Sequence, residues 1–249
     1  MSARPDSDAF GPPRLHAAGE AGILVEFGSR YAPEVNAAVL AFDAALAAEA
    51  PAGLRETVPS FRSLLVLFDP LALRFEALEE QLQALLQSRD WYHAPAPGGG
   101  NHWELPVAFG GADGPDLGEV AELTGMRADQ LIEDLASQRL TVAMLGFAPG
   151  LAYLGQLPER WDFPRRSAIN PQVPAGAVLV AVRQVVLPST GIPTGWRQIG
   201  RTPFRSFDPF SRRPFLLAPG DSLRFVPGDA ESLARFDMAA LRRAAEAEG

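Results

Sequence analysis

Two stretches of the chain combine arginine with glycine, proline and aromatic residues in a way that suits the binding of an anion. The first, GFAPGLAYLGQLPERWDFPRR, runs from Gly146 to Arg166 and ends in two adjacent arginines. The second, PTGWRQIGRTPFRSFDPFSRRP, runs from Pro193 to Pro214. A guanidinium binds phosphate or carboxylate through paired hydrogen bonds, and a glycine-rich turn can direct backbone N–H groups at an oxyanion. The stretches are candidate walls of an anion site, and a solvated surface is the alternative.

Positive charge is concentrated in this part of the sequence. The chain of 249 residues has a net charge of -8, whereas the segment 160–213 holds nine arginines against two acids, Asp162 and Asp208, and so carries +7. An acidic chain does not suit general nucleic-acid binding. The local excess of arginine favours instead a pocket for a phosphate or carboxylate group, or a solvated basic face.

The residue types that are missing exclude several kinds of chemistry. There is no cysteine, which excludes thiol nucleophiles, disulfides and cysteine-type zinc sites. Every basic residue other than histidine is arginine, so no lysine is present for a Schiff base or a P-loop. The three histidines, His16, His93 and His102, all lie in the first half, and we expect no metal site.

The sequence predicts two domains and a cytoplasmic location. No apolar run approaches the roughly 20 residues of a membrane helix, and the first residues lack the apolar core of a signal peptide. We interpret residues 1–18 as a disordered lead-in. The segment HAPAPGGGNH, His93–His102, is dense enough in proline and glycine to mark a boundary between domains.

The first domain, residues 19–94, is predicted to be a small α/β sandwich. The run GILVEFG from Gly22 is typical of a strand, and the apolar run Leu64–Phe68 of a buried one. Apolar residues recur at helical spacing from Val35 to Leu46 and from Phe75 to Leu86. Strand, helix, strand and helix in this order favour helices packed on one face of a sheet.

The second domain, residues 100–228, is predicted to be an antiparallel β-barrel or sandwich. A strand in WELPVAFGG precedes two short helices around Leu117 and Leu131. Short apolar runs separated by glycine and proline then predict strands in LTVAMLGF, AVLVAVRQVVLP, WRQIG and PFLLAPGDSLRFVP, with APGD as a turn between the last two. Residues 229–249 are expected to form a C-terminal helix.

Many of these segments resemble one known family, in the order in which that family has them. They include SFRSLLVLFDP, PVAFGGADGPDLGEVAELTGM, VAMLGFAPGLAYLGQLP, VPAGAV, GWRQIGRTP and LLAPGDSLRFVP. From about Gly22 to Pro227 the chain is similar to the allophanate hydrolase subunit 1 family, also called KipI-like or PxpB, the 5-oxoprolinase B subunit. The resemblance implies an α+β chain, with a small N-terminal α/β domain and a cyclophilin-like β-barrel.

The resemblance also implies an activity that needs partners. Family members work beside a KipA-like (PxpC-like) subunit, and some pairs join a PxpA-like protein to hydrolyse 5-oxo-L-proline to glutamate with ATP. ATP is then a cofactor shared with a partner subunit, because phosphorylation of the amide oxygen activates a lactam toward water. The alternatives are an allophanate or urea carboxylase-type carboxyltransferase subunit, and a non-catalytic regulator such as a histidine-kinase inhibitor. The barrel shape alone does not support a prolyl isomerase.

The candidate site combines the motifs with the chemistry of the residues, and no catalytic residue is assigned. Arg201 is an anion contact or the partner of Asp208 in a salt bridge, and Trp196 is a site or core aromatic. Asp116 is expected to cap a helix and Asp221 to form a turn. The full set of ligand- or anion-binding candidates is Phe147, Pro149, Gly150, Tyr153, Arg165, Arg166, Asn170, Gln184, Gly195, Trp196 and Arg201.

Several positions depart from the family pattern, and we expect them to cluster in the groove of the barrel. Leu135 stands where family members usually carry a histidine, and Ile169-Asn170 where they carry Pro-Arg. The usual QTGIYP reads QVVLP from Gln184, so that Val185–Leu187 differ, while Ala177 replaces a serine and Thr194 a glycine. These departures indicate a divergent member with an altered substrate or with lost activity.

Overall fold

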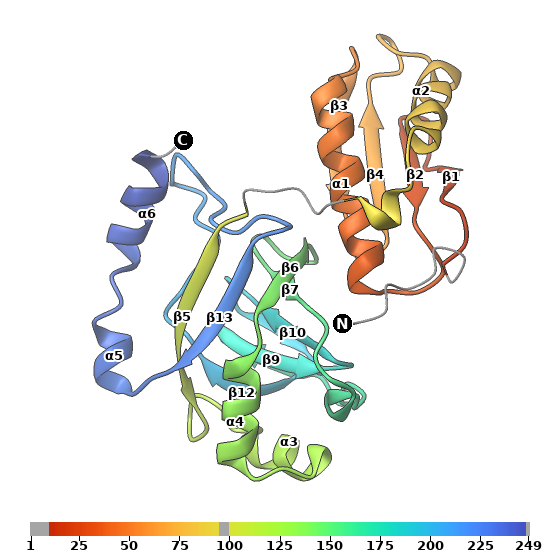
Figure 1. Cartoon of the computed structure of the whole chain (residues 1–249). Helices are drawn as coiled ribbons and strands as arrows, with labels where there is room; N and C mark the ends of the chain where they lie inside the picture. The colour runs from red at the N-terminus through yellow and green to blue at the C-terminus, as the bar shows by residue number, and fades with distance from the viewer. Residues whose placement is uncertain (1–9, 95–99, 248–249) are drawn as a thin grey trace. The chain divides into compact units, whose positions relative to one another are not determined.

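The computed structural model describes residues 10–94 and 100–247, and the chain divides into two compact units, residues 1–99 and 100–249 (Figure 1). Residues 1–9 of the expected lead-in, 95–99 of the expected linker and 248–249 of the tail lie outside the described residues. Among the described residues, no helix is both long enough and apolar enough to cross a bilayer.

The first unit is an antiparallel sheet with the strand order β1-β2-β4-β3, combined with two helices. Its elements are β1 (Arg14–Ala17), β2 (Gly22–Glu26), α1 (Pro33–Glu49), β3 (Leu54–Pro59), β4 (Ser63–Phe68), α2 (Phe75–Gln87) and the short 3-10 helix Trp91–His93. The interpretation of residues 1–18 as disordered is wrong for Arg14–Ala17. This segment pairs with β2, which places Leu15 opposite Val25.

One apolar cluster holds the first unit together. Side chains alternate along β4, so that Leu64, Val66 and Phe68 are buried while the residues between them are partly exposed. Helices α1 and α2 contribute to the same cluster, for example through Phe42 and Leu82. The predicted sandwich of helices on a sheet is therefore confirmed.

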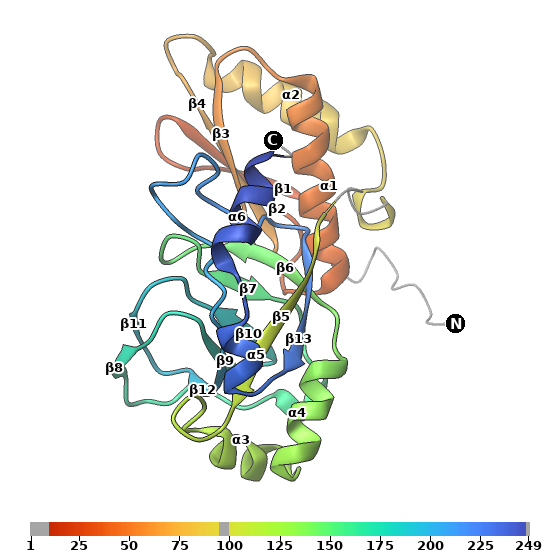
Figure 2. The same ribbon diagram turned by 90° about the vertical axis from the view of Figure 1, so that its left-hand side faces the viewer.

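The second unit is a closed barrel with the strand order β10-β7-β6-β13-β5-β12-β9. Strands β8 (Asn170–Val173) and β11 (Ile192–Thr194) form a separate pair, seen side by side in Figure 2. The barrel strands are β5 (His102–Phe109), β6 (Leu140–Leu145), β7 (Ala152–Leu154), β9 (Ala177–Ala181), β10 (Gln184–Leu187), β12 (Arg197–Arg201) and β13 (Ser222–Pro227).

One pairing corrects the prediction of a purely antiparallel barrel. Strands β5 and β13 run parallel, from the pair His102–Ser222 to the pair Val107–Pro227, and they lie side by side in Figure 1. Parallel neighbours need a long connection between them. Here the connection runs from the end of β5 at Phe109 to the start of β13 at Ser222 and contains the other barrel strands. The predicted turn at APGD is confirmed, since the Asp221 carboxylate accepts a hydrogen bond from Ala218 N at 3.0 Å. The strand predicted in PFLL before this turn is not formed: the segment that leads into the turn is irregular, and β13 follows the turn.

Short helices flank the barrel. They are α3 (Leu117–Thr124), α4 (Ala128–Ser137), the 3-10 helix Glu159–Trp161, α5 (Ala230–Ala234) and α6 (Met238–Ala247). The prediction of one C-terminal helix over 229–249 is wrong, because Asp229 and Asp237 each cap a separate helix. Their carboxylates accept hydrogen bonds from Ser232 N and Ala240 N, both at 2.8 Å.

Candidate functional site

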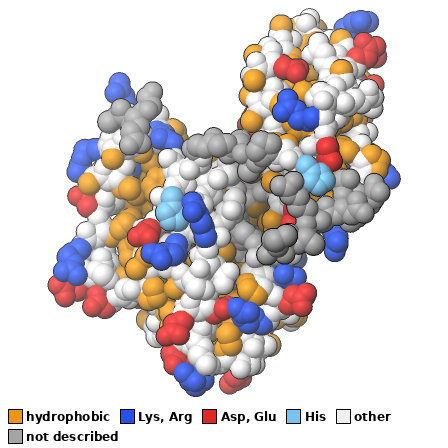
Figure 3. Space-filling view, viewed as in Figure 1, with side chains coloured by type: hydrophobic (Ala, Val, Ile, Leu, Met, Phe, Trp, Pro, Cys, Tyr) orange, Lys and Arg blue, Asp and Glu red, His pale blue; other side chains and the backbone are white. Residues whose placement is uncertain are grey.

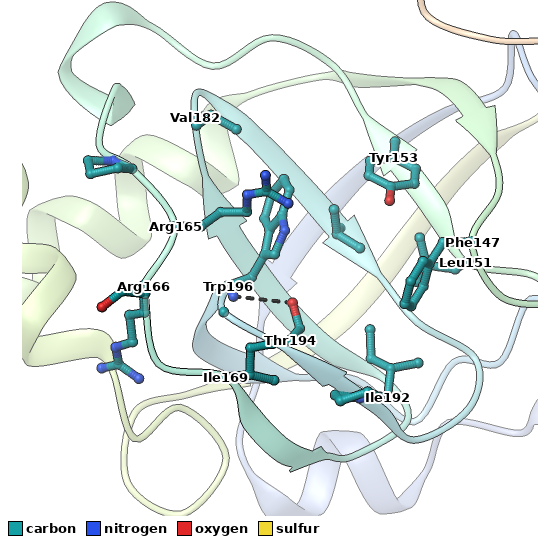
Figure 4. A pocket seen from close by; sticks show the side chains of 15 residues that line it. Phe147, Leu151, Tyr153, Arg165, Arg166, Ile169, Val182, Ile192, Thr194 and Trp196 are labelled. Carbon is teal, nitrogen blue, oxygen red and sulfur yellow. Dashed lines mark hydrogen bonds between the residues drawn. The ribbon is translucent and has the colours of Figure 1, made fainter.

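A cavity of about 750 Å³ opens in the second unit, and Figure 4 shows the side chains around it. Its walls come from four segments: the turn after β6 with β7, the loop 164–169, the hairpin of β9 and β10, and the segment 192–196. The lining residues are Phe147, Leu151, Tyr153, Pro164, Arg165, Arg166, Ser167, Ile169, Val182, Val186, Ile192, Pro193, Thr194, Gly195 and Trp196.

The cavity brings some of the candidate residues together and leaves others apart. Those that line it are Phe147, Tyr153, Arg165, Arg166, Gly195 and Trp196. Those that do not are Pro149, Gly150, Asn170, Gln184 and Arg201. Sequence reasoning did not single out Leu151, Ser167, Val182 or Ile192. Val182 and Ile192 lie in the turn of the β9–β10 hairpin and in β11, which carry no chemical motif, and Leu151 is an apolar residue within the glycine-rich stretch that reads as core.

Arg166 is held by carboxylates of helix α3 rather than left free for a ligand. Its guanidinium donates to Asp116 at 2.9 Å and forms an ion pair with Glu119. Asp116 was expected to cap α3, but its side chain accepts no capping bond and instead accepts Gln198 N at 2.7 Å. In Figure 4 the Arg166 side chain points away from the other labelled side chains.

Arg197 completes this network from the barrel side. It is buried, and its Nε donates to Glu119 at 2.8 Å while Nη1 donates to the Pro164 carbonyl at 2.7 Å. The hydrogen bond from Arg166, together with Arg197, holds the pKa of Glu119 below its ordinary value, against the opposing effect of burial. The network thus fixes the loop that carries Arg165 and Arg166 to α3 and β12.

Other arginines of the basic segment are neutralised in the same way. Arg160 pairs with Asp134 of α4, and Arg201 pairs with Asp113 at 2.9 Å. The proposed bridge between Arg201 and Asp208 is therefore wrong; Asp208 lies 3.8 Å from Arg242 instead. Acidic residues between positions 113 and 134 thus compensate the charge of four arginines of the basic segment. Figure 3 shows positive and negative side chains mixed over the region of α3 and α4.

Arg165 differs from these neighbours. It is exposed and lines the cavity, and within the part of the chain that the structure describes it forms no ion pair. Burial raises the pKa of the Tyr153 hydroxyl, and the positive charge of Arg165 opposes that rise. Among the described residues that line the cavity, Arg165 is therefore the cation whose charge no carboxylate compensates.

Two glycines shape the backbone around the site. The Arg166 N–H donates to the Gly195 carbonyl at 2.7 Å, and a Cβ at residue 195 would lie 2.5 Å from the Arg166 carbonyl oxygen. Gly150 has a positive φ of 68° and packs against Ser206 and Phe207 too closely for a side chain. Gly150 thus fixes the turn that presents Phe147. The oxyanion site expected at this turn stays a prediction.

Aromatic and aliphatic side chains form most of the remaining wall. The rings of Tyr153 and Trp196 meet edge to face with centroids 6.3 Å apart. Leu151, Val186 and Ile192 are buried beside them. As far as the described residues show, the site is therefore an apolar cavity with one unpaired cation at its edge.

The departures from the family pattern do not all cluster here, contrary to expectation. Ile169, Val186 and Thr194 line the cavity. Leu135 is buried in the core with Ala177, and Asn170 lies outside the cavity, where its side chain accepts Gln172 N at 3.1 Å. No group of three or more His, Asp or Glu side chains suited to a metal occurs among the described residues.

The barrel and its cavity lie largely within a carboxyltransferase-type domain. The family model for the carboxyltransferase domain, subdomains C and D, matches residues 13–217. The chain belongs to this family, as the motifs led us to expect.

The chain is also similar to named relatives and to a solved structure. The chain is 32% identical over 227 residues to the 5-oxoprolinase B subunit of Bacillus subtilis, covering 86% of this chain and 92% of the relative. It is 40% identical over 174 residues to the 5-oxoprolinase B subunit of Escherichia coli O157:H7, covering 69% and 77%. The crystal structure of TTHA0988 superposes with a TM-score of 0.71 at 31% identity over 84% of this chain, which spans only 40% of that longer protein.

Proposed function

We propose that this chain is the PxpB-type component of a cytoplasmic complex that hydrolyses 5-oxo-L-proline to L-glutamate with ATP. Two relatives that are named as the B subunit of 5-oxoprolinase, at 32% and 40% identity, support the reaction. The observation that carries the proposal is Arg165, unpaired among the described residues and placed beside an apolar cavity. A guanidinium binds the carboxylate of the lactam acid, and the Tyr153–Trp196 wall keeps water from its ring.

The described residues of this chain do not suit the phosphates of ATP. A triphosphate carries several negative charges, whereas Arg165 is the unpaired arginine of the cavity and Arg166 is already matched by Asp116 and Glu119. We therefore assign the phosphate chain to the partner, a KipA-like subunit, with a PxpA-like protein as the third component. This chain binds and orients the acid.

A carboxyltransferase role is the second candidate, because the matching family model is named for that domain. It would use the same cavity for a carboxylated carrier. A non-catalytic regulator would use the cavity only to hold a partner.

Reconstitution separates these functions. We would co-express the chain with the KipA-like and PxpA-like proteins and measure glutamate release from 5-oxo-L-proline with and without ATP. The proposal expects ATP-dependent release, a loss of tenfold or more with Arg165→Gln, and no change with Arg224→Gln, an exposed barrel arginine paired with Glu104. A folded complex without ATP-dependent release would refute the reaction.

A further inference from the structure

The cavity is larger than a lactam acid requires. Its volume of about 750 Å³ lies in the range of sites for drug-sized ligands, about 300–1,000 Å³. A cavity of about 150 Å³ already holds a benzene ring. 5-Oxo-L-proline, a single small ring with one carboxylate, would leave most of the space unfilled.

The inner wall offers that space to an apolar group. Leu151, Val186, Ile192 and Trp196 are all buried, and Figure 4 shows Leu151, Ile192 and Trp196 around the cavity. Burial of apolar surface favours binding in proportion to the area removed from water. A ligand that reaches these side chains gains affinity that the bare lactam cannot.

The rim extends the apolar surface outward. Phe147, Ile169 and Val182 line the same cavity although they are 74%, 67% and 42% exposed. Phe147 and Val182 have positive φ angles of 71° and 45°, a conformation that costs a residue with a side chain free energy. At Val182 this conformation, shared with Arg183, belongs to the two-residue turn of the β9–β10 hairpin, and at Phe147 it belongs to the turn after β6. Both turns thus hold an apolar side chain at the rim of the cavity.

The charge of the site restricts the ligand further. Arg165 has no ion-pair partner among the described residues, and the charge of Arg166 is compensated by Asp116 and Glu119. One guanidinium matches one carboxylate. A second anionic group on the ligand would have no partner among the described lining residues.

We propose that the cavity selects amide acids with a single carboxylate and an aromatic or branched aliphatic substituent beyond the lactam ring. This inference rests on the proposed function, because it assigns a substrate class to the same site. Arg165 binds the carboxylate, the buried wall receives the substituent, and Ile169 covers it from the rim.

Calorimetric titration of the full chain tests this selection with three probes: 5-oxo-L-proline, N-benzyl-5-oxo-L-proline and the uncharged carboxamide of the benzyl compound. We expect the benzyl acid to bind tenfold or more tightly than 5-oxo-L-proline, and the carboxamide tenfold or more weakly than the benzyl acid. Arg165→Gln should weaken both acids. Ile169→Ser should reduce only the benzyl preference, and Arg224→Gln should change neither.

Equal affinities for the two acids, no binding of the benzyl acid at millimolar concentration, or a benzyl preference that survives Ile169→Ser would overturn the inference. So would loss of the preference once the partner proteins are added, since partner side chains would then cover the rim. The hydrolysis assay stays independent. If glutamate is released but the benzyl acid binds no more tightly, the proposed reaction stands and the inferred substrate selection fails. If the benzyl acid binds more tightly but no glutamate is released, the selection stands and the proposed reaction fails.

Discussion

Arg165 and Arg166 are adjacent in the chain and lie in opposite electrostatic surroundings. The Arg166 guanidinium is bound by Asp116 and Glu119 of the α3 region, whereas Arg165 lines the cavity and forms no ion pair with any described residue. Arg166 therefore ties the loop to the α3 region, and the binding of an anionic ligand that we propose falls to Arg165.

The two arginines should therefore contribute unequally to stability. Arg166→Gln should lower the free energy of unfolding by about 1–2 kcal/mol, because it leaves two carboxylates and the buried Arg197 in an unbalanced network. Arg165→Gln should change it by less than about 0.5 kcal/mol, as expected for an exposed side chain. Urea unfolding of both variants measures the difference, and equal effects would contradict the assignment.

The same network predicts a dependence on pH. The pKa of Glu119 is lowered in the folded chain, mainly by its hydrogen bond from Arg166. Its stabilising contribution is therefore fully present above the ordinary glutamate pKa of about 4.3 and is lost as the pH falls through the lowered value. The stability difference between the natural chain and Glu119→Gln should shrink on acidification. A constant difference from pH 7 to pH 3 in urea unfolding would count against it.

Gly150 should tolerate a methyl group much less than a glycine in open space. Gly150→Ala combines a positive φ with a clash against Phe207 and Ser206, so we expect a loss of more than about 2 kcal/mol. Gly111→Ala has the same kind of backbone, with nothing within 4 Å of the new Cβ, and should lose only about 1 kcal/mol. Thermal unfolding of the two variants compares them, and similar losses would show that close packing is unimportant.

Phe147 should be replaceable by glycine without loss of stability. Phe147→Gly relieves about 1–2 kcal/mol of left-handed strain, which offsets the added entropy of the unfolded chain, about 0.4–1 kcal/mol. Phe210 is the control, because it is 97% exposed and is not among the residues with positive φ. Phe210→Gly should therefore lower the free energy of unfolding by about 0.4–1 kcal/mol, the entropic cost alone. The two unfolding free energies decide the matter, and the reverse order would disprove strain at Phe147.

Periodicity was enough to locate the elements with strong local patterns. The helices α1 and α2 and the strands β2 and β4 follow directly from apolar spacing, because each has a face buried against one sheet or helix layer. The pairing of β5 with β13 was not predictable in this way. Both strands read as short apolar runs, and such runs carry no signal for direction or partner across the barrel.

The site was predictable as a region, while its chemistry was not. The glycine-rich motifs pointed to Phe147, Tyr153 and Trp196, which do line the cavity. The partners of the arginines depend on packing between segments far apart in sequence, as Arg201 with Asp113 shows. The net charge of segment 160–213 therefore overestimated the positive charge around the cavity, because its arginines pair with acids outside the segment. Only the fold shows that Arg165 is, among the described residues, the unpaired cation of the cavity.

The parallel pairing of β5 with β13 sets the order in which the barrel can form during synthesis. The two strands lie 120 residues apart in the chain, so β5 leaves the ribosome long before its neighbour exists. Until β13 emerges, one edge of β5 and one edge of β6 stay open to other chains. A message that ends before Ser222 would yield an unclosed, chaperone-dependent sheet, not a smaller barrel.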